Sequence, residues 1–340
     1  MTITVSEPVA RRASPRVRGK AAAPKSIQIR KILVPLDFSE PSRDAVEFSL
    51  PLLQRFGAEL HLVHVVPPDY PLSGLEDLPL VVPEIEIGRR IRRHLKDAAH
   101  EFSVELRREN IHALKGRPFE EICRLARDLD IDLIITSTRG LTGLKHLTLG
   151  STAERIVRYS TCPVLVVRHE RKAKKGKITP RRFGFAKILV PIDFSECSMK
   201  GLEYAKVLAR QFQSKLVLVH SVHVEYYVTS DEYARFDLPL VMEEAEKASR
   251  QQMRDLVQKT DWDGIQVETS LQVGHPGEQI CAKAEKAGAD LIVTSTHGKT
   301  GLKHVFLGST AEYVVRHASC PILIVPSQPR PAPTAAATRI

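Results

Sequence analysis

Hydrophobic residues in this chain alternate between short apolar runs and longer stretches where they recur at helical spacing. The short runs, at residues 32–34, 60–66, 111–114, 131–137 and 163–167, are typical of strands buried on both faces. The longer stretches, at 44–56, 84–109, 118–128 and 151–159, are typical of amphipathic helices, and Gly57 is suited to end the first. Apolar strands that alternate with helices predict a parallel sheet covered on both faces.

The whole pattern occurs twice. The sequence KILVPLDFSE at 31–40 returns as KILVPIDFSE at 187–196, and residues 137–167 share 20 of 31 positions with 295–325. The period is 156 to 158 residues, far longer than the roughly 20–50 residues of solenoid repeats. We therefore expect two doubly wound, five-stranded, Rossmann-like α/β domains in tandem, at 29–168 and 185–326.

Basic charge is concentrated outside these two domains. Residues 1–31 carry eight Lys or Arg and one Glu, and residues 168–187 carry nine and one Glu, although the whole chain is only +10. The domains themselves are therefore net negative. We expect a disordered basic tail at 1–28, a basic linker at 169–184 and a disordered tail at 327–340. No aromatic residues interleave with this charge, which argues against specific nucleic-acid recognition, and no apolar run is long enough for a membrane span.

The five cysteines show no metal-binding or redox spacing. Cys123 and Cys162 repeat as Cys281 and Cys320, each in an apolar context, and Cys197 has no counterpart. Buried free thiols suit a reducing compartment, and the N-terminus has no apolar stretch typical of a secretory signal. These features predict a cytoplasmic protein.

The chemistry is expected after the first and fourth strands of each domain, because doubly wound sheets bind ligands where the strand order reverses. After the fourth strand come Ser137 and Gly140, nine residues, and then Gly150-Ser151-Thr152 ahead of a helix. The second copy has Ser295, Gly298 and Gly308-Ser309-Thr310 in the same places. Free N–H groups and hydroxyls at a helix N-terminus attract anions. The alternative is that the glycines mark a turn and Ser151 caps the helix.

Other candidate residues lie at the same edge of the sheet. Asp37 and Asp193 follow the first strands, where they either bind ribose hydroxyls or Mg²⁺, or act as turn residues before the next helix. Glycine-x-proline turns follow the third strands, with Arg117 and His275 at the middle position. His64 and His220 are expected to be packed and hydrogen-bonded, whereas His146 and His304, inside the nine-residue loops, are placed either against a phosphate or on a solvated loop face.

The motifs in both halves resemble those of the universal stress protein (UspA) family. The strand-one sequences 34–39 and 190–195, the glycine, nine residues, glycine-serine loop, and the stretch 151–167 are all similar to the family pattern. The resemblance implies an adenine nucleotide alpha hydrolase-like fold that binds ATP, with or without Mg²⁺. Ser137 and Ser295 stand where ATP-binding members have the first glycine of the loop.

The resemblance also implies a nucleotide-binding set in each copy. The set comprises Pro35, Leu36, Asp37, Val65, Gly116, Ser137, Gly140, Gly150, Ser151 and Thr152 in the first half, and Pro191, Ile192, Asp193, Ser221, Gly274, Ser295, Gly298, Gly308, Ser309 and Thr310 in the second.

The leading hypothesis is a nucleotide-binding stress or signalling protein without a dedicated catalytic set. The alternatives are a slow ATPase, a nucleotide-free protein-interaction module and a nucleic-acid binder that uses its basic tails. The fifth strands are short and apolar, and an open edge of this kind invites aggregation. In the family such strands meet across a two-fold axis, so we expect the two halves to pair, with a homodimer of paired chains as a further expectation.

Overall fold

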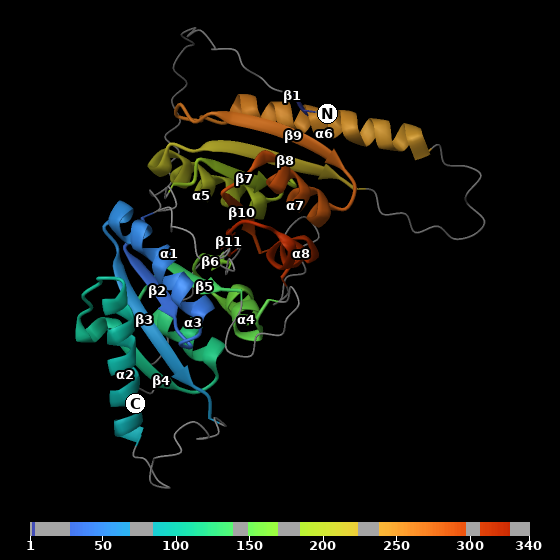
Figure 1. Cartoon of the computed structure of the whole chain (residues 1–340). Coiled ribbons are helices and arrows are strands. Elements are labelled where there is room, and N and C mark those ends of the chain that lie inside the picture. Colours follow the sequence, from blue (N-terminus) through green and yellow to red (C-terminus); the bar gives the residue numbers. More distant parts are fainter. Residues whose placement is uncertain are drawn as a thin grey trace, which may run out of the picture.

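The computed structural model describes residues 2–3, 28–68, 84–138, 149–168, 184–223, 238–296 and 307–326 (Figure 1). Gly140, Gly298, His146 and His304, and most of the expected tails and linker, lie outside these residues. None of the described helices combines the length and the apolar character needed to cross a bilayer.

Strands and helices alternate along the first half as expected. They are β2 (Lys31–Pro35), α1 (Glu40–Phe56), β3 (Glu59–Val66), α2 (Glu84–Glu101), the 3₁₀ turn η1 (Arg108–Asn110), β4 (Ile111–Lys115), α3 (Pro118–Asp128), β5 (Leu133–Ser137), α4 (Ser151–Tyr159) and β6 (Val164–Val167).

The second half repeats this order. Its elements are β7 (Lys187–Pro191), α5 (Glu196–Phe212), β8 (Lys215–Val222), α6 (Leu238–Lys259), β9 (Val267–Val273), α7 (Pro276–Ala287), β10 (Leu291–Ser295), α8 (Ser309–His317) and β11 (Ile322–Val325).

Each half is a doubly wound parallel sheet. The strand order is β4-β3-β2-β5-β6 in the first half and β9-β8-β7-β10-β11 in the second, so the order reverses between β2 and β5 and between β7 and β10. Buried residues of α1, α2, α5 and α6 contribute to the core on one face of the sheet, and those of α3, α4, α7 and α8 to the core on the other. The predicted fold class is confirmed.

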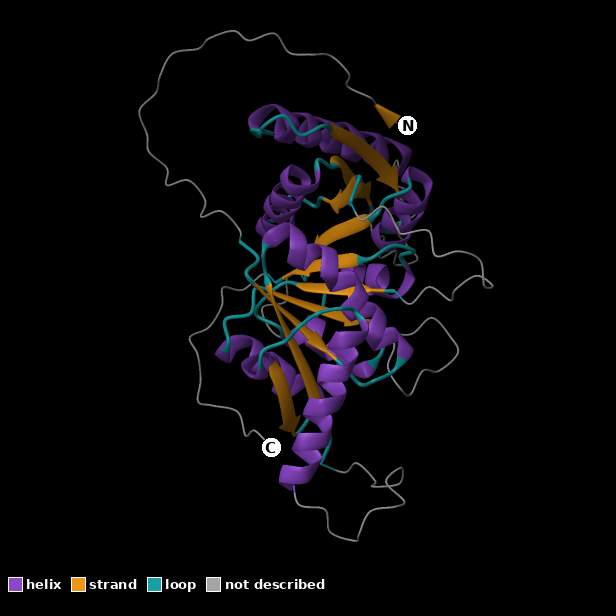
Figure 2. Cartoon of the chain, turned by 60° about the vertical axis from the view of Figure 1, so that its left-hand side comes forward, coloured by secondary structure: helices purple, strands orange, loops and turns teal. Residues whose placement is uncertain are grey.

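The two halves join edge to edge through their last strands. β6 runs antiparallel to β11, with Val166 opposite Ile322, Leu165 opposite Leu323, and Val164 opposite Ile324. The described strands therefore form one continuous sheet across both halves (Figure 2). The apolar fifth strands thus cover each other, which confirms the expected pairing within the chain.

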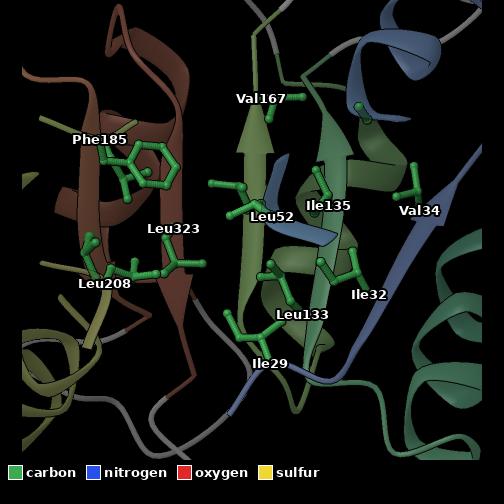
Figure 3. Packing of buried hydrophobic residues seen from close by; sticks show 14 of the residues in the cluster. Ile29, Ile32, Val34, Leu52, Leu133, Ile135, Val167, Phe185, Leu208 and Leu323 are labelled. Atoms are coloured by element: carbon green, nitrogen blue, oxygen red, sulfur yellow. The ribbon is translucent and has the colours of Figure 1, made fainter. Parts of the chain in front are cut away.

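Aromatic side chains reinforce this junction on one face of the sheet. Phe185, which is 5% exposed, has its ring centroid 6.3 Å from that of Phe48 and 5.0 Å from that of Phe212. Figure 3 shows Phe185, Leu208 and Leu323 of the second half beside Leu52 and other residues of the first. The core on this face is therefore shared by the two halves.

Three local features differ from the sequence-based expectations. The helix expected at 84–109 ends at Glu101, because Ser103 adopts a left-handed conformation (φ 58°) and the Val104 N–H turns back to the Ala99 carbonyl oxygen. Helix α1 begins at Glu40 rather than at residue 44, since the Ser39 hydroxyl caps it. Thr2–Ile3, in the tail expected to be disordered, form strand β1 antiparallel to β9.

Candidate functional site

Asp37 and Ser137 lie at the carboxyl ends of the two strands between which the strand order reverses. β2 and β5 are neighbouring parallel strands, with Ile32 opposite Leu133, and their carboxyl ends lead to Asp37 and to the loop after Ser137. Pro35 ends β2, and the Leu36 N–H donates to the Val63 carbonyl oxygen on β3 at 2.8 Å. The second half has the same contact between Ile192 and Val219 at 2.8 Å, after Pro191.

The base of each candidate phosphate loop is closed by backbone hydrogen bonds. The Thr138 N–H donates to the Val167 carbonyl oxygen at 3.0 Å, and the Gly150 N–H donates to the Thr138 carbonyl oxygen at 2.7 Å. The second half repeats both bonds, from Thr296 to Val325 at 3.1 Å and from Gly308 to Thr296 at 2.9 Å. The two ends of the loop are therefore adjacent, and they hold the start of the following helix beside the end of β5 or β10.

Helices α4 and α8 begin without a side-chain cap. The N-cap residue is Gly150 (φ −62°, ψ 142°) in the first half and Gly308 in the second, and neither helix has a side-chain hydrogen bond at its cap. Ser151 is exposed and is the first residue inside the helix. The alternative that Ser151 caps the helix is therefore wrong, because the N-cap position belongs to Gly150. The first N–H groups of a helix have no intrahelical partner, and this end carries the positive part of the helix dipole. Both starts are therefore suited to an anion.

An acidic side chain in the first turn of α4 is held by arginines. The Glu154 carboxylate lies 3.1 Å from Arg158 Nη2 on the same helix and 3.4 Å from Arg316 Nη2 on α8. These cations offset the negative charge near the helix start. Because Arg316 belongs to the second half, the contact also joins the two helices that follow the candidate loops.

Asp37 and Asp193 support the N-cap serines of the helices that follow them. Asp37 Oδ1 accepts from the Ser39 N–H at 3.1 Å and from the Ser39 hydroxyl at 2.5 Å, and Asp193 Oδ1 accepts from Ser195 at 3.0 and 2.6 Å. The serines, and not the aspartates, are the N-caps of α1 and α5. Each aspartate thus has a defined structural role beside any part in ligand binding.

The histidines of the second strands are packed and hydrogen-bonded, as expected. His64 Nδ1 lies 2.7 Å from the Leu36 carbonyl oxygen, and His220 Nδ1 lies 2.6 Å from that of Ile192. Both nitrogens therefore donate. Burial lowers the pKa of His64, which favours the neutral ring, and the Phe38 ring stacks on it at 4.7 Å.

The turns after the third strands require glycine. Gly116 (φ 148°) and Gly274 (φ 129°) donate to the carbonyl oxygens of Val66 and Val222, both at 3.0 Å. A Cβ atom at Gly116 would lie 2.8 Å from Glu121 Cγ.

The two turns differ in how they are held. Ser221 Oγ donates to the Gly274 carbonyl oxygen at 2.8 Å, whereas the matching side chain in the first half is the buried, apolar Val65.

Sequence reasoning missed a set of rings beside the second site. His275 lies 5.8 Å from His223 and 5.5 Å from Tyr313 of α8, measured between ring centroids, and Tyr313 stacks on His317 at 4.1 Å. In the first half Arg117 instead pairs with Glu120 at the surface. The signal was present in the sequence, because the two otherwise similar copies differ at these positions.

Among the described residues, no group of three or more His, Cys, Asp or Glu side chains is arranged to hold a metal ion.

Comparisons with known proteins agree on one family. The model of the universal stress protein family matches residues 28–168 and 184–326. The universal stress protein MJ0531 of Methanocaldococcus jannaschii is 34% identical over 42% of this chain and 82% of its own length. A universal stress protein of Mycolicibacterium smegmatis is 24% identical over 86% of this chain and 96% of its own.

A solved structure shares the two-domain arrangement. The universal stress protein from Archaeoglobus fulgidus has a TM-score of 0.60 and 21% identity, and the match covers 88% of this chain and all of that one. The matching motifs, the repeated doubly wound sheet and the repeated family match lead to one conclusion: this chain belongs to the universal stress protein family and carries two of its domains in tandem.

Proposed function

We propose that the chain binds ATP at two sites, one in each half, and acts in stress response or signalling without dedicated catalysis. The observation that carries this proposal is the repeated, uncapped helix start at Gly150 and Gly308, held beside the reversal point of each sheet.

The residues at these points fit an adenine nucleotide. Free N–H groups at the start of α4, with the hydroxyls of Ser151 and Thr152, suit phosphate oxygens. In this proposal the apolar side chain of Val65 on β3 packs against the base, and Asp37, which follows β2, accepts hydrogen bonds from the ribose hydroxyls. The whole nucleotide-binding set, including Ser137, Gly140, Ser295 and Gly298, stays a prediction from the family pattern.

Binding is favoured over turnover by the chemistry at the sheet edge. The acidic groups there, Asp37 and Asp193, each engage a capping serine through Oδ1. His64 and His220 each donate Nδ1 to a main-chain oxygen. A slow hydrolysis by bound water is the most we expect.

The test is mass spectrometry of nucleotide released from denatured, freshly purified protein, followed by calorimetry with ATP, ADP and cAMP. Gly150 has a φ of −62°, which valine adopts without strain. The Gly150→Val and Gly308→Val double variant should therefore fold and lose binding, because the added side chains block close approach of a phosphate. Absence of ATP binding by the wild type at millimolar nucleotide would refute the proposal.

The second candidate function is a nucleotide-free protein-interaction module. It is favoured by Ser137 and Ser295, both buried, in place of the first loop glycine. Restoring Gly at both positions separates the two hypotheses: a nucleotide binder should gain affinity, and an interaction module should show no nucleotide binding before or after the change.

Two further features belong to the proposal. We place the protein in a reducing compartment, the cytoplasm, in agreement with its five free cysteines. A homodimer of whole chains would need a surface other than β6 and β11, because these strands already pair with each other. Light scattering after size-exclusion chromatography measures that state directly.

A further inference from the structure

Two buried histidines face each other on the outer strands of the first half. His61 on β3 and His112 on β4 are 5% and 3% exposed, and β4 is the edge strand of that half among the described strands. His61 Nδ1 lies 3.2 Å from His112 Nε2, with the ring planes 16° apart. This N–H···N bond needs one ring to donate a proton and the other to offer a lone pair, so it cannot form when both rings are charged. The pair therefore ties β4 to β3 only while at least one ring is neutral.

The surroundings of the pair favour the neutral form of His61. Its other ring nitrogen, Nε2, is buried without a hydrogen-bond partner, and the Glu59 carboxylate is 3.8 Å away, beyond hydrogen-bonding distance. A protonated ring carries two N–H donors, and the described residues offer an acceptor in place for one of them. Burial and the positive charge of Lys31 lower the pKa of His61 below its ordinary value of about 6.5, against the opposing charge of Glu59.

The charged groups near the pair come from all the elements packed around it. Lys31 of β2 has its Nζ fixed to the Leu129 carbonyl oxygen at 3.0 Å. Helix α3 packs over the same face of the sheet, since Leu125 shares a core with Val63, two residues beyond His61. The other charged residues of these elements are Glu59 of β3, Arg108 and Glu109 of η1, Lys115 of β4, and Glu120, Glu121, Arg124, Arg127 and Asp128 of α3.

The second half has no histidine at either place. In matching strand register, Val217 of β8 stands for His61 and Ser270 of β9 stands for His112. Both side chains are buried, and Ser270 Oγ accepts from Gln272 Nε2 at 2.7 Å. Neither valine nor serine changes charge with pH. The titratable link between the two outer strands therefore belongs to the first half.

We propose that the His61–His112 pair is a pH-sensitive latch, which holds β4 on β3 while it is neutral and releases the strand when it is protonated. In the released state both rings reach water and bind protons at their ordinary pKa, whereas the closed state binds fewer protons. Acidification below about pH 6.5 therefore shifts the equilibrium toward release, and above this pH the latch is fully closed. β4 leads directly into Gly116, whose N–H donates to the Val66 carbonyl oxygen, so release also loosens this turn.

The test is amide hydrogen exchange of the full chain between about pH 7.5 and pH 5, with the rates expressed as protection factors to remove the intrinsic effect of pH. We expect the protection of the β4 and Gly116 amides to fall by up to about tenfold per pH unit below 6.5, the limit for one proton taken up on release. The amides of the matching strand β9 should keep their protection. No fall at β4, or an equal fall at β9, would overturn the proposal.

Variants assign the effect to the pair. His61→Val combined with His112→Ser gives the first half the residues that the second half has at these places, and the protection of β4 should then be independent of pH. The matched control is His100→Gln, which replaces an exposed histidine of α2 and should leave the pH dependence as in the wild type. A pH dependence that persists in the double variant contradicts the latch.

A second measurement needs no variant to fold. The ¹⁵N shifts of the histidine side chains in the wild type report which ring nitrogens carry protons. At about pH 7 the ring of His61 should be neutral with β4 protected, and its protonation on acidification should coincide with the loss of protection. A His61 ring that is charged at neutral pH, or that titrates while β4 stays protected, rules the latch out.

Discussion

The pairing of β6 with β11 can be tested by placing a charge on it. Val166 is fully buried, lies opposite Ile322 across the junction and also pairs with Thr136 of β5. Replacing Val166 with Lys removes about 1.5–3 kcal/mol of apolar burial. The substitution also brings an ammonium group into the core, at an effective cost of several kcal/mol. The total is comparable with the lower part of the roughly 5–15 kcal/mol that stabilises a domain.

We therefore expect Val166→Lys to separate the halves or to precipitate the protein. Small-angle scattering measures the compactness of the chain, and circular dichroism reports whether each half stays folded. The matched control is Val273→Lys on β9, since Val273 is 47% exposed and its replacement should change stability by no more than about 0.5 kcal/mol. A Val166→Lys protein with the scattering profile and Tm of the wild type would refute the reasoning.

Three further predictions follow from differences between the halves and from burial. Exchanging Val65 and Ser221 should transfer about 1 kcal/mol of ATP affinity from the first site to the second, which calorimetry on single-site variants measures. Gly277→Phe should lower the free energy of unfolding by about 1–3 kcal/mol, because a Cβ atom there would lie 2.7 Å from the Tyr313 side chain. Adding Tyr313→Arg, which gives the residue found at this place in the first half, should restore Tm. Burial lowers the pKa of His64, so the unfolded chain binds more protons. Stability should therefore fall as pH drops below about 6.5, and His64→Asn should flatten that fall in denaturant titrations.

Much of the fold follows from the sequence because its determinants are local. The apolar strands, the amphipathic helices and the repeat are all visible without coordinates, and they imply two parallel sheets. The reversal point between β2 and β5 also follows, since a doubly wound order places it there. The composition of the fifth strands predicted that each needs a cover, because a strand that is apolar on both faces does not stay open, and the family resemblance supplied the expectation that they cover each other.

The sites were predictable only in part. The glycine-serine pattern locates the starts of α4 and α8, but whether Ser151 or Gly150 caps the helix depends on backbone angles that the sequence leaves open. The role of Asp37 as a support for Ser39 likewise needs the turn to be folded.

Tertiary structure alone decided how the two copies diverge. The sequence shows Trp262 in the second half and no tryptophan near the matching segment of the first. Only the structure shows that this ring lies over Lys206, and that Leu50, at the matching position, borders a groove. The same holds for the contact between Glu154 and Arg316, which are 162 residues apart. The physical reason is that periodicity and turn chemistry act between near neighbours in the chain. Cavities and cross-domain ion pairs arise only when distant segments are brought together, and their free energies depend on that geometry.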